Sequence, residues 1–437
     1  MDLKLSRYTV PTSIINPEEK PALRKRILYS AVSNTAVIVM DAVFHTLSNG
    51  SYEEIEQEVR TKLENASILV PADKNEFSAV LAENKIPNRM LSVILHATSH
   101  CLLGCHCGKK SRHESRASEL TEKIMNYLDV QLQHDRFDAW HITWDGGDAL
   151  ADLPLVKEIS QHNIKLSAKY DKLYTASMII NGENLHTDNF RNLFYDCRIR
   201  HFHIVMRGSM DTELNRQILS NIDHILTHVP FQPRDGIIFE IKVNVDKNNQ
   251  DEIFDMIDQL GAGNLQNRVI FKFCSESSYC EDEHKYRFSY TPQEFAGLEI
   301  EYLVHAAKNG FPVNFLPSRA LTSCPAVNEN FVTVDVQGNM FGCYALPYTD
   351  HEYYVSNMMG NIFSDPSLHR TDLTFRRWYD ELEMHHGACY DCNLFPVCGG
   401  GCRLKWGEGS DGCPSFRYNF EDRLILNYLA QKGAFNS

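Results

Sequence analysis

The stretch CYDCNLFPVCGGGC (389–402) holds four cysteines and sits near the end of a chain of 437 residues. Cys324, Cys343 and Cys413 lie on either side of it, so this part of the chain contains seven of the thirteen cysteines. Thiolates gathered in this way, with glycines between them, are typical of soft metal centres, either tetrahedral zinc or iron–sulfur clusters. A structural zinc ribbon and an iron–sulfur centre explain the segment about equally well.

A second cysteine cluster, CLLGCHC (101–107), lies far upstream and favours the iron–sulfur interpretation. An odd number of cysteines in a reducing compartment does not indicate a disulfide framework, so metal ligation is the expected role of most of them. Cys197 and Cys274 lie in or beside apolar segments and are expected to be small buried hydrophobes. Cys280 is left over from this division.

Composition limits the classes of function. Hydrophobic residues make up 43% of the chain, which is enough for two or three domains with cores of their own. A net charge of −14 argues against a sequence-independent nucleic-acid surface. The N-terminus MDLKLSRYTV lacks the pattern of a signal peptide, and no apolar run approaches the length of a membrane span. We therefore expect a cytoplasmic protein that binds neither nucleic acid nor membrane.

Residues 1–85 predict a small α+β unit. Three apolar, β-branched runs predict its strands, at 7–10, 26–32 and 35–40. A helix is expected from Ser51, which forms a capping pattern with Glu54. The order of elements resembles a winged-helix-like module, the PqqD-like domain that binds leader peptides in peptide-maturation enzymes. That resemblance implies peptide recognition, while a packing domain without a ligand fits the same pattern.

Residues 86–311 alternate between strands and amphipathic segments. Six runs predict buried strands, at 91–97, 141–147, 173–180, 201–206, 237–245 and 269–274. The alternation indicates an α/β fold with a parallel sheet, and six repeats are too few for a closed eight-stranded barrel. We predict a partial (β/α)6 TIM-like barrel. Its active site should lie at the C-terminal ends of the strands, where CLLGCHC, GGD and NGEN follow the first three.

The residues from about Leu91 to Phe416 resemble the radical SAM enzymes that carry a C-terminal SPASM extension. In that family three cysteines after the first barrel strand hold a 4Fe-4S cluster, whose open iron binds S-adenosyl-L-methionine (SAM). The resemblance assigns this role to Cys101, Cys105 and Cys107. Only His106 separates the last two, which is one residue fewer than in the family. His106 stands where the family keeps an aromatic residue beside the adenine, and its imidazole is also a candidate metal ligand.

Other residues resemble the SAM-binding motifs of the family. Gly146, Gly147 and Asp148 stand where the family has the GGE of its GGEP motif, which receives the amino group of SAM. The acid here is one methylene shorter. Asn181 matches an asparagine–glycine turn after the third strand, and Asn244 lies in a strand that contacts the ribose and carboxylate.

The same resemblance implies a cysteine-rich iron–sulfur domain, with a C-terminal helix, at residues 312–437. It would hold two auxiliary 4Fe-4S clusters with interleaved ligands. The first takes Cys324, Cys343 and Cys402. The second takes the other four cysteines of the tail, Cys389, Cys392, Cys398 and Cys413. Ser318 occupies the position of a further family cysteine, so the first cluster is expected to have a vacant iron or an unidentified fourth ligand, for which Cys280 is a candidate.

The resemblance implies reductive cleavage of SAM to a 5′-deoxyadenosyl radical, and it assigns no catalytic side chain. With a leader-binding candidate at the N-terminus, it predicts a maturase of a ribosomally made precursor peptide that forms a thioether, carbon–carbon or related cross-link. Electrons would come from a donor such as flavodoxin or ferredoxin.

Two alternatives stay open. One is a side-chain oxidase like the anaerobic sulfatase maturases. The other is a non-catalytic peptide-binding or electron-relay protein with a decayed SAM site, which the short cysteine spacing and the GGDA sequence favour.

Overall fold

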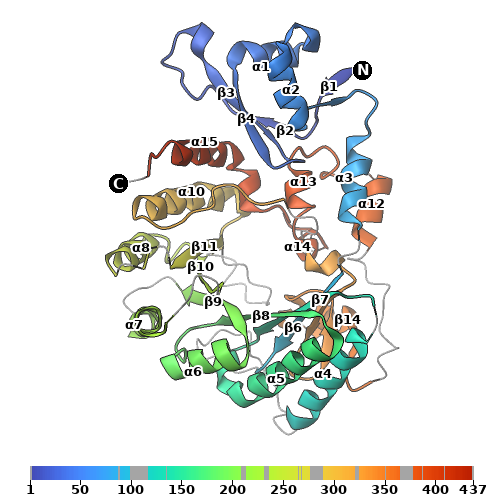
Figure 1. Cartoon of the computed structure of the whole chain (residues 1–437), viewed down its shortest axis with the longest axis vertical. Coiled ribbons are helices and arrows are strands. Elements are labelled where there is room, and N and C mark those ends of the chain that lie inside the picture. Colours follow the sequence, from blue (N-terminus) through green and yellow to red (C-terminus); the bar gives the residue numbers. More distant parts are fainter. Residues whose placement is uncertain are drawn as a thin grey trace.

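The structure is a computed structural model. It describes residues 2–86, 89–98, 117–133, 135–207, 213–230, 236–263, 265–266, 268–275, 289–319, 324–349, 351–364, 377–385, 387–407 and 409–435. The central element is a nine-stranded sheet with the order β11-β10-β9-β8-β7-β6-β12-β13-β14 (Figure 1).

The six strands predicted from the sequence are all present, and they pair in parallel in chain order. They are β6 (Met90–His96), β7 (Ala139–Asp145), β8 (Leu173–Ile180), β9 (Ile199–Arg207), β10 (Ile238–Val245) and β11 (Val269–Ser275). Parallel neighbours need a crossover, so each strand is followed by a helical segment. The prediction of an α/β fold with a parallel sheet is confirmed.

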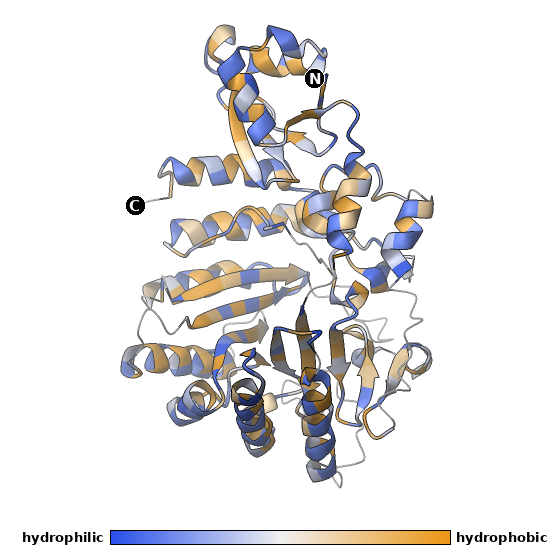
Figure 2. Ribbon diagram, turned by 45° about the vertical axis from the view of Figure 1, so that its right-hand side comes forward, coloured by the Kyte–Doolittle hydropathy of each residue, from blue (hydrophilic) through white to orange (hydrophobic). Residues whose placement is uncertain are grey.

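Helices cover one face of this sheet (Figure 1). They are α4 (Ala117–Leu132), α5 (Leu153–Tyr170), α6 (Thr187–Arg191), α7 (Glu213–His228), α8 (Glu252–Ala262) and α10 (Pro292–Lys308). Each longer helix is amphipathic; in α7, for example, Ile218, Ile222 and Ile225 are buried at helical spacing. Figure 2 shows the resulting alternation of apolar and polar stripes along the ribbons. Across the described residues, no helix combines the length and apolar composition that a membrane span requires.

The two faces of the sheet differ in polarity. In β7, Trp140, Ile142 and Trp144 are fully buried in the main hydrophobic core, beneath the helices. The residues between them, His141 and Thr143, point to the opposite face because successive side chains of a strand alternate. The same alternation in β8, β9 and β10 gives this inner face a polar character.

The C-terminal part of the chain extends the sheet. β12 (Phe331–Val334) pairs in parallel with β6, and β13 (Asn339–Phe341) and β14 (Met358–Asn361) continue in antiparallel order. The sheet therefore runs across the predicted domain boundary at residue 311. The remaining helices of the tail are α11 (His351–Ser356), α12 (Trp378–His385), α13 (Phe395–Cys398), α14 (Arg403–Gly407) and α15 (Phe420–Gln431).

The N-terminal unit contains a three-stranded antiparallel sheet and a separate two-stranded one. Its elements are β1 (Leu3–Leu5), β2 (Thr9–Pro11), β3 (Lys25–Ser30), β4 (Thr35–Met40), α1 (Asp41–Ser48), α2 (Gln57–Asn65), β5 (Leu69–Pro71) and α3 (Glu76–Asn84). The predicted helix start at Ser51 is wrong. Ser51 makes no capping bond, and Ile55 takes an extended conformation with its side chain buried, so α2 begins only at Gln57.

The N-terminal unit is docked on the cysteine-rich tail rather than standing apart. Phe77 of α3 contacts the Tyr390 ring, with centroids 4.7 Å apart, and the Phe395 ring at 5.5 Å. Arg7 also stacks on Tyr390, at 4.6 Å from the ring centroid. These residues belong to or border one hydrophobic cluster that includes Cys389. The unit and the tail therefore share a core.

The shared core makes a stability prediction. Phe77 is only 3% exposed, so Phe77→Ala should lower the free energy of unfolding by about 3–5 kcal/mol. Because Phe77 contacts the tail, the backbone amides of residues 389–398 should exchange hydrogen for deuterium faster in Phe77→Ala than in the wild type. Hydrogen–deuterium exchange followed by mass spectrometry measures this rate. Leu63→Ala is the matched control, because Leu63 is buried inside the N-terminal unit alone. Equal acceleration at 389–398 in both variants would contradict the shared core.

Candidate functional site

Four cysteines of the tail meet in one narrow pocket. Cys389, Cys392 and Cys398 come from a single turn-rich segment that ends in α13, and Cys413 returns from beyond α14. The rest of the wall is mainly apolar and consists of Leu394, Phe395, Gly400, Pro414, Phe416 and Arg417. Arg417 Nη1 lies 3.1 Å from the sulfur of Cys413. These four are the cysteines that the resemblance assigns to the second auxiliary cluster.

The other three tail cysteines form a separate group. Cys343 is buried, and Cys324 and Cys402 pack against it in a small hydrophobic cluster. Cys324 precedes β12 and Cys343 follows β13, so the hairpin of these strands brings both to the same side as Cys402 at the start of α14. The interleaved partition expected from the resemblance thus has a counterpart in the packing.

Three glycines between Cys398 and Cys402 allow the chain to pass from one group to the other. Gly399, Gly400 and Gly401 all have positive φ, at 59°, 101° and 69°. Glycine adopts this region without the steric cost that a Cβ brings. A Cβ on Gly401 would lie 2.1 Å from the carbonyl oxygen of Gly412.

The distances between the sulfurs bear on the identity of the metal. Zn–S bonds of about 2.3 Å in a tetrahedron place the sulfurs about 3.8 Å apart. In the described part of the chain, no three cysteine sulfurs lie within 4.8 Å of one another. This spread favours a larger, multi-iron group over a single zinc ion.

Burial strongly disfavours charge on these thiols when no metal is present. It raises the pKa of Cys343 and of Cys398 to about 12, and that of Cys413 to about 11. Thiols with such pKa values keep their protons at neutral pH. A bound cationic metal centre reverses this preference, because a coordinating thiol is deprotonated.

Arg403 lies between the two cysteine groups and is only 2% exposed. Its guanidinium stacks on Trp378, 3.3 Å from the ring centroid, and Nη2 donates to the Gly401 carbonyl oxygen at 3.2 Å. Nε and Nη1 have no hydrogen-bond partner. Burial lowers the pKa of Arg403 to about 10, and thiols of both groups, those of Cys324 and Cys389 foremost, act against this effect. A buried cation of this kind requires a nearby anion, and a thiolate-bound iron–sulfur cluster supplies one.

The residues predicted to bind SAM lie at or beside the C-terminal ends of strands of the parallel sheet. Gly146 and Gly147 follow β7 with φ of 80° and 58°. A Cβ on Gly146 would lie 2.6 Å from Cβ of His96, so glycine is required where the ends of β6 and β7 approach. Asp148 is 1% exposed; its Oδ1 accepts a hydrogen bond from the Leu150 amide at 3.2 Å.

Asn181 and Asn244 lie at the ends of β8 and β10, on the same edge as the Gly146 turn. Asn181 is buried, and its Oδ1 accepts from the Glu183 amide at 2.9 Å, while its Nδ2 has no partner. Nδ2 of Asn184, from the same turn, donates to Oδ2 of Asp148 at 2.9 Å and joins this turn to that of β7. The structure thus brings the predicted sheet residues to one edge. The loop with Cys101, Cys105, His106 and Cys107 lies outside the described residues.

Sequence reasoning missed several residues near this edge and on the inner face. His96 ends β6 and stacks on Tyr348 of the tail, with centroids 5.2 Å apart. His201, His203 and Glu240 form a compact polar group on β9 and β10. The alternation of HFH in a strand is a signal that both imidazoles share one face, but their partner Glu240 lies on another strand.

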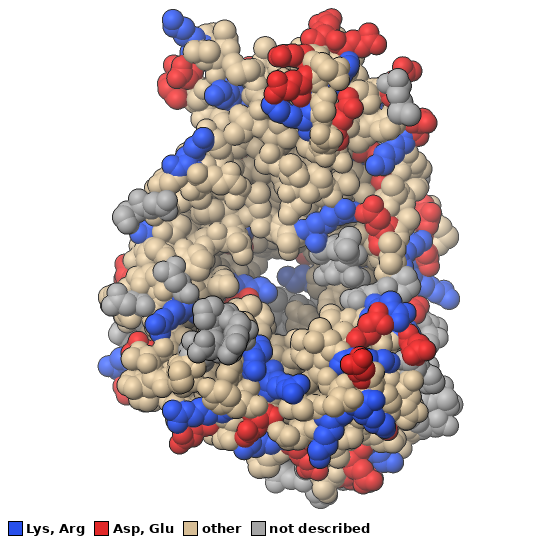
Figure 3. Space-filling view, viewed as in Figure 1, with Lys and Arg blue, Asp and Glu red and all other residues tan. Residues whose placement is uncertain are grey.

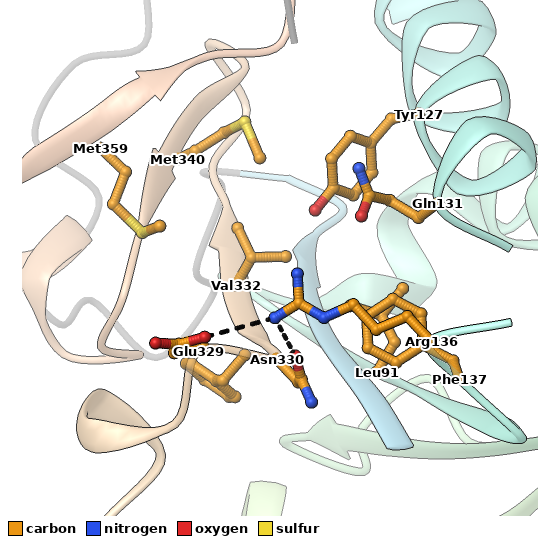
Figure 4. Close-up of a pocket in the computed structure, with 11 residues that line it drawn as sticks. Leu91, Tyr127, Gln131, Arg136, Phe137, Glu329, Asn330, Val332, Met340 and Met359 are labelled. Atoms are coloured by element: carbon orange, nitrogen blue, oxygen red, sulfur yellow. Dashed lines mark hydrogen bonds and ion pairs between the residues drawn. The ribbon is translucent and has the colours of Figure 1, made fainter. Parts of the chain in front are cut away.

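The molecule also has a surface hollow and a cavity. Figure 3 shows the molecule hollowed near the middle of one face. A cavity of about 230 Å³ lies at the N-terminal ends of β6 and β12, away from the predicted SAM residues (Figure 4). Arg136 borders it and is held by Asn330 at 2.5 Å and Glu329 at 3.5 Å. None of the residues that line this cavity was predicted to be functional.

The chain matches no protein-family model and no curated protein sequence. Among solved structures it is similar to native anSMEcpe with bound AdoMet, with a TM-score of 0.54 at 15% identity, covering 79% of this chain and 99% of that chain. Native anSMEcpe with bound AdoMet and Cp18Cys peptide gives a TM-score of 0.53 at 14% identity, covering 80% and 99%. anSMEcpe is an anaerobic sulfatase-maturating enzyme with a radical SAM/SPASM architecture. The likeness shows that the chain has the fold of anSMEcpe.

Gly401 offers a test of the cysteine arrangement. Gly401→Ala should lower the free energy of unfolding by more than about 2 kcal/mol, because positive φ and the clash with Gly412 act together. It should also reduce the iron bound after anaerobic reconstitution. Gly409→Ala is the matched control, since Gly409 has φ of 72° but open space around it. Similar losses in the two variants would show that φ alone matters.

The buried charge of Arg403 gives a second test. Its removal should not lower stability in the metal-free protein but should weaken iron binding in the reconstituted protein. Without metal, Arg403→Met should leave the free energy of unfolding unchanged or higher, because it removes a buried charge that has no anionic partner. After anaerobic reconstitution the same variant should retain less iron than the wild type. Arg403→Lys keeps the charge and should retain more iron than Arg403→Met. A loss of stability in the metal-free Met variant would contradict this account.

Proposed function

We propose that this protein is a radical SAM enzyme of the SPASM type that modifies a peptide. The observation that carries the proposal is the interleaving of seven tail cysteines into two groups, in a chain with the fold of anSMEcpe. The sulfur spacing and the buried Arg403 support iron–sulfur clusters in both groups. Cys324, Cys343 and Cys402 would hold one auxiliary 4Fe-4S cluster, and the four cysteines of the pocket the other.

The SAM site would lie at the edge where β7, β8 and β10 end. Cys101, Cys105 and Cys107 would hold its 4Fe-4S cluster, with His106 beside the adenine. When bound there, SAM and the cluster supply the 5′-deoxyadenosyl radical. We assign the amino group of SAM to the backbone of the turn at Gly146 and Gly147.

Two side chains would complete this site. Both carboxylate oxygens of Asp148 are already hydrogen-bonded, so Asp148 would fix the shape of the turn. Nδ2 of Asn181 is a buried donor without a partner, which suits it to a ligand oxygen. Asn244 would contact the ribose or carboxylate from β10. An electron donor such as flavodoxin or ferredoxin would reduce the clusters.

The proposed substrate is a ribosomally made precursor peptide. anSMEcpe is known with bound AdoMet and Cp18Cys or Kp18Cys peptide. Those matches leave about a fifth of this chain uncovered, which is also the share taken by residues 1–85. We assign residues 1–85 to peptide recognition, 86–311 to the SAM barrel and 312–437 to the auxiliary clusters. The product would be a thioether, carbon–carbon or related cross-link.

A second candidate, side-chain oxidation, is favoured by the likeness to anSMEcpe itself. It uses the same SAM chemistry but changes one residue, whereas a cross-link joins two. Tandem mass spectrometry of the modified peptide separates the two, because a cross-link prevents fragmentation between the joined residues.

The first experiment is anaerobic reconstitution followed by iron and sulfide analysis and by assay of 5′-deoxyadenosine with SAM and dithionite. We expect about twelve iron atoms per chain, in three four-iron clusters, and formation of 5′-deoxyadenosine. The double variant Cys105→Ala/Cys107→Ala should lose about four iron atoms and all product. Cys389→Ala/Cys392→Ala should lose about as much iron but still form 5′-deoxyadenosine, because the cluster that it removes does not bind SAM.

Other outcomes would redirect the proposal. About eight iron atoms without 5′-deoxyadenosine would mean that the tail clusters are loaded and the SAM site is inactive. The non-catalytic peptide-binding or electron-relay function would then replace the enzyme. Zinc in place of iron in the cysteine groups would overturn both.

A further inference from the structure

We propose that His201, His203 and Glu240 form a binding site for a divalent transition-metal ion such as zinc, on the inner face of the sheet. The three side chains project from β9 and β10 on the inner face of the sheet, where polar residues alternate with the buried ones. His201 and Glu240 lie near the N-terminal ends of their strands, and His203 lies at the centre of β9. The site is therefore separate from the predicted SAM edge and from both cysteine groups.

The geometry of the three residues suits one small ion. One ligand atom from each residue lies within 4.8 Å of the other two. His203 and Glu240 are direct neighbours in the β9–β10 register, and His203 Nδ1 is 2.8 Å from Glu240 Oε1. His201 precedes His203 by two residues on the same strand, and their rings stack with centroids 3.9 Å apart. In the described part of the chain, no other group of three histidine, cysteine or acidic side chains meets this distance.

An unsatisfied nitrogen gives independent support. Nε2 of His201 is buried and has no hydrogen-bond partner. Leaving a buried polar atom without a partner costs about 1–3 kcal/mol, so native proteins rarely do so without a reason. A metal ion bound through Nε2 of His201 would give this nitrogen a partner.

The site is enclosed but remains accessible to an ion. The side chains of His203 and Glu240 are 22% and 16% exposed. Two imidazoles and one carboxylate are ligands that zinc and related ions accept. Three protein ligands leave one tetrahedral position for water or another small ligand from the barrel interior.

Polar side chains from the neighbouring strands surround the site. His141 faces it from β7, and both of its ring nitrogens are engaged, Nδ1 with Thr175 and Nε2 with Ser177, each at 2.8 Å. Lys272, from β11, attracts Glu240 but forms no ion pair with it at 4 Å or less. Lys272 is exposed, so solvent screens its charge and the Glu240 carboxylate stays free to bind a metal ion.

Zinc binding to the reconstituted full-length protein tests the inference without any assay of activity. Iron–sulfur loading occupies the cysteines first, and Zn²⁺ is then added from a buffered micromolar stock. We expect about one zinc per chain in the wild type. The isosteric variant Glu240→Gln and the variant His203→Ala should both reduce zinc toward zero. His224→Ala is the matched control, because His224 and His228 are also stacked histidines, 4.1 Å apart, but on the exposed surface of α7.

The outcomes separate this site from the proposed function. Unchanged iron content and circular dichroism in Glu240→Gln would show that the variant is folded, so a loss of zinc would report the site itself. If the wild type binds no zinc, or if both variants bind as much as the wild type, the inference is overturned. Should the cysteine groups take zinc instead of iron, the proposed function fails, while the share of zinc that depends on Glu240 still decides this inference.

Discussion

The pairing of β12 with β6 is the constraint on which the rest of the structure depends. β6 leads toward the loop that carries the first predicted cluster, and β12 lies between Cys324 and Cys343. A parallel ladder between residues more than two hundred positions apart fixes the tail against the six-stranded parallel part of the sheet, beginning at the hydrogen bond from the Ser92 amide to the Asn330 carbonyl at 2.8 Å. One strand thus sets the position of both iron–sulfur regions that we propose.

The sequence is informative where its signals are local. Six β-branched runs predict the six parallel strands, and the spacing of Cys389, Cys392, Cys398 and Cys402, through the family resemblance, predicts the grouping that the packing displays. Signals that depend on distant partners are lost. β12 has four residues, and nothing near it in the sequence indicates that it joins the large sheet. The helix predicted from Ser51 starts later because Ile55 is buried in an extended conformation. The residues that bury it lie elsewhere in the N-terminal unit.

Buried charge follows the same physical rule at two places in the molecule. Arg403 is a buried cation beside the thiols of both cysteine groups, and an anionic group between them would compensate its charge. His201, His203 and Glu240 present the opposite case, a set of electron-pair donors with one nitrogen left unused. In each place the polypeptide supplies half of an electrostatic arrangement. Arg403 needs an anionic partner and the histidine–glutamate group needs a cationic one. We therefore assign iron–sulfur clusters to the first place and a metal ion to the second.

The docked N-terminal unit also has a kinetic consequence. Tyr8, Phe77 and Leu81 pack in the same hydrophobic cluster as Cys389. Dioxygen attacks exposed iron–sulfur centres, so the cluster that we propose at Cys389 would be better protected while residues 1–85 stay docked. Its lifetime in air would then depend on how often this docking contact breaks.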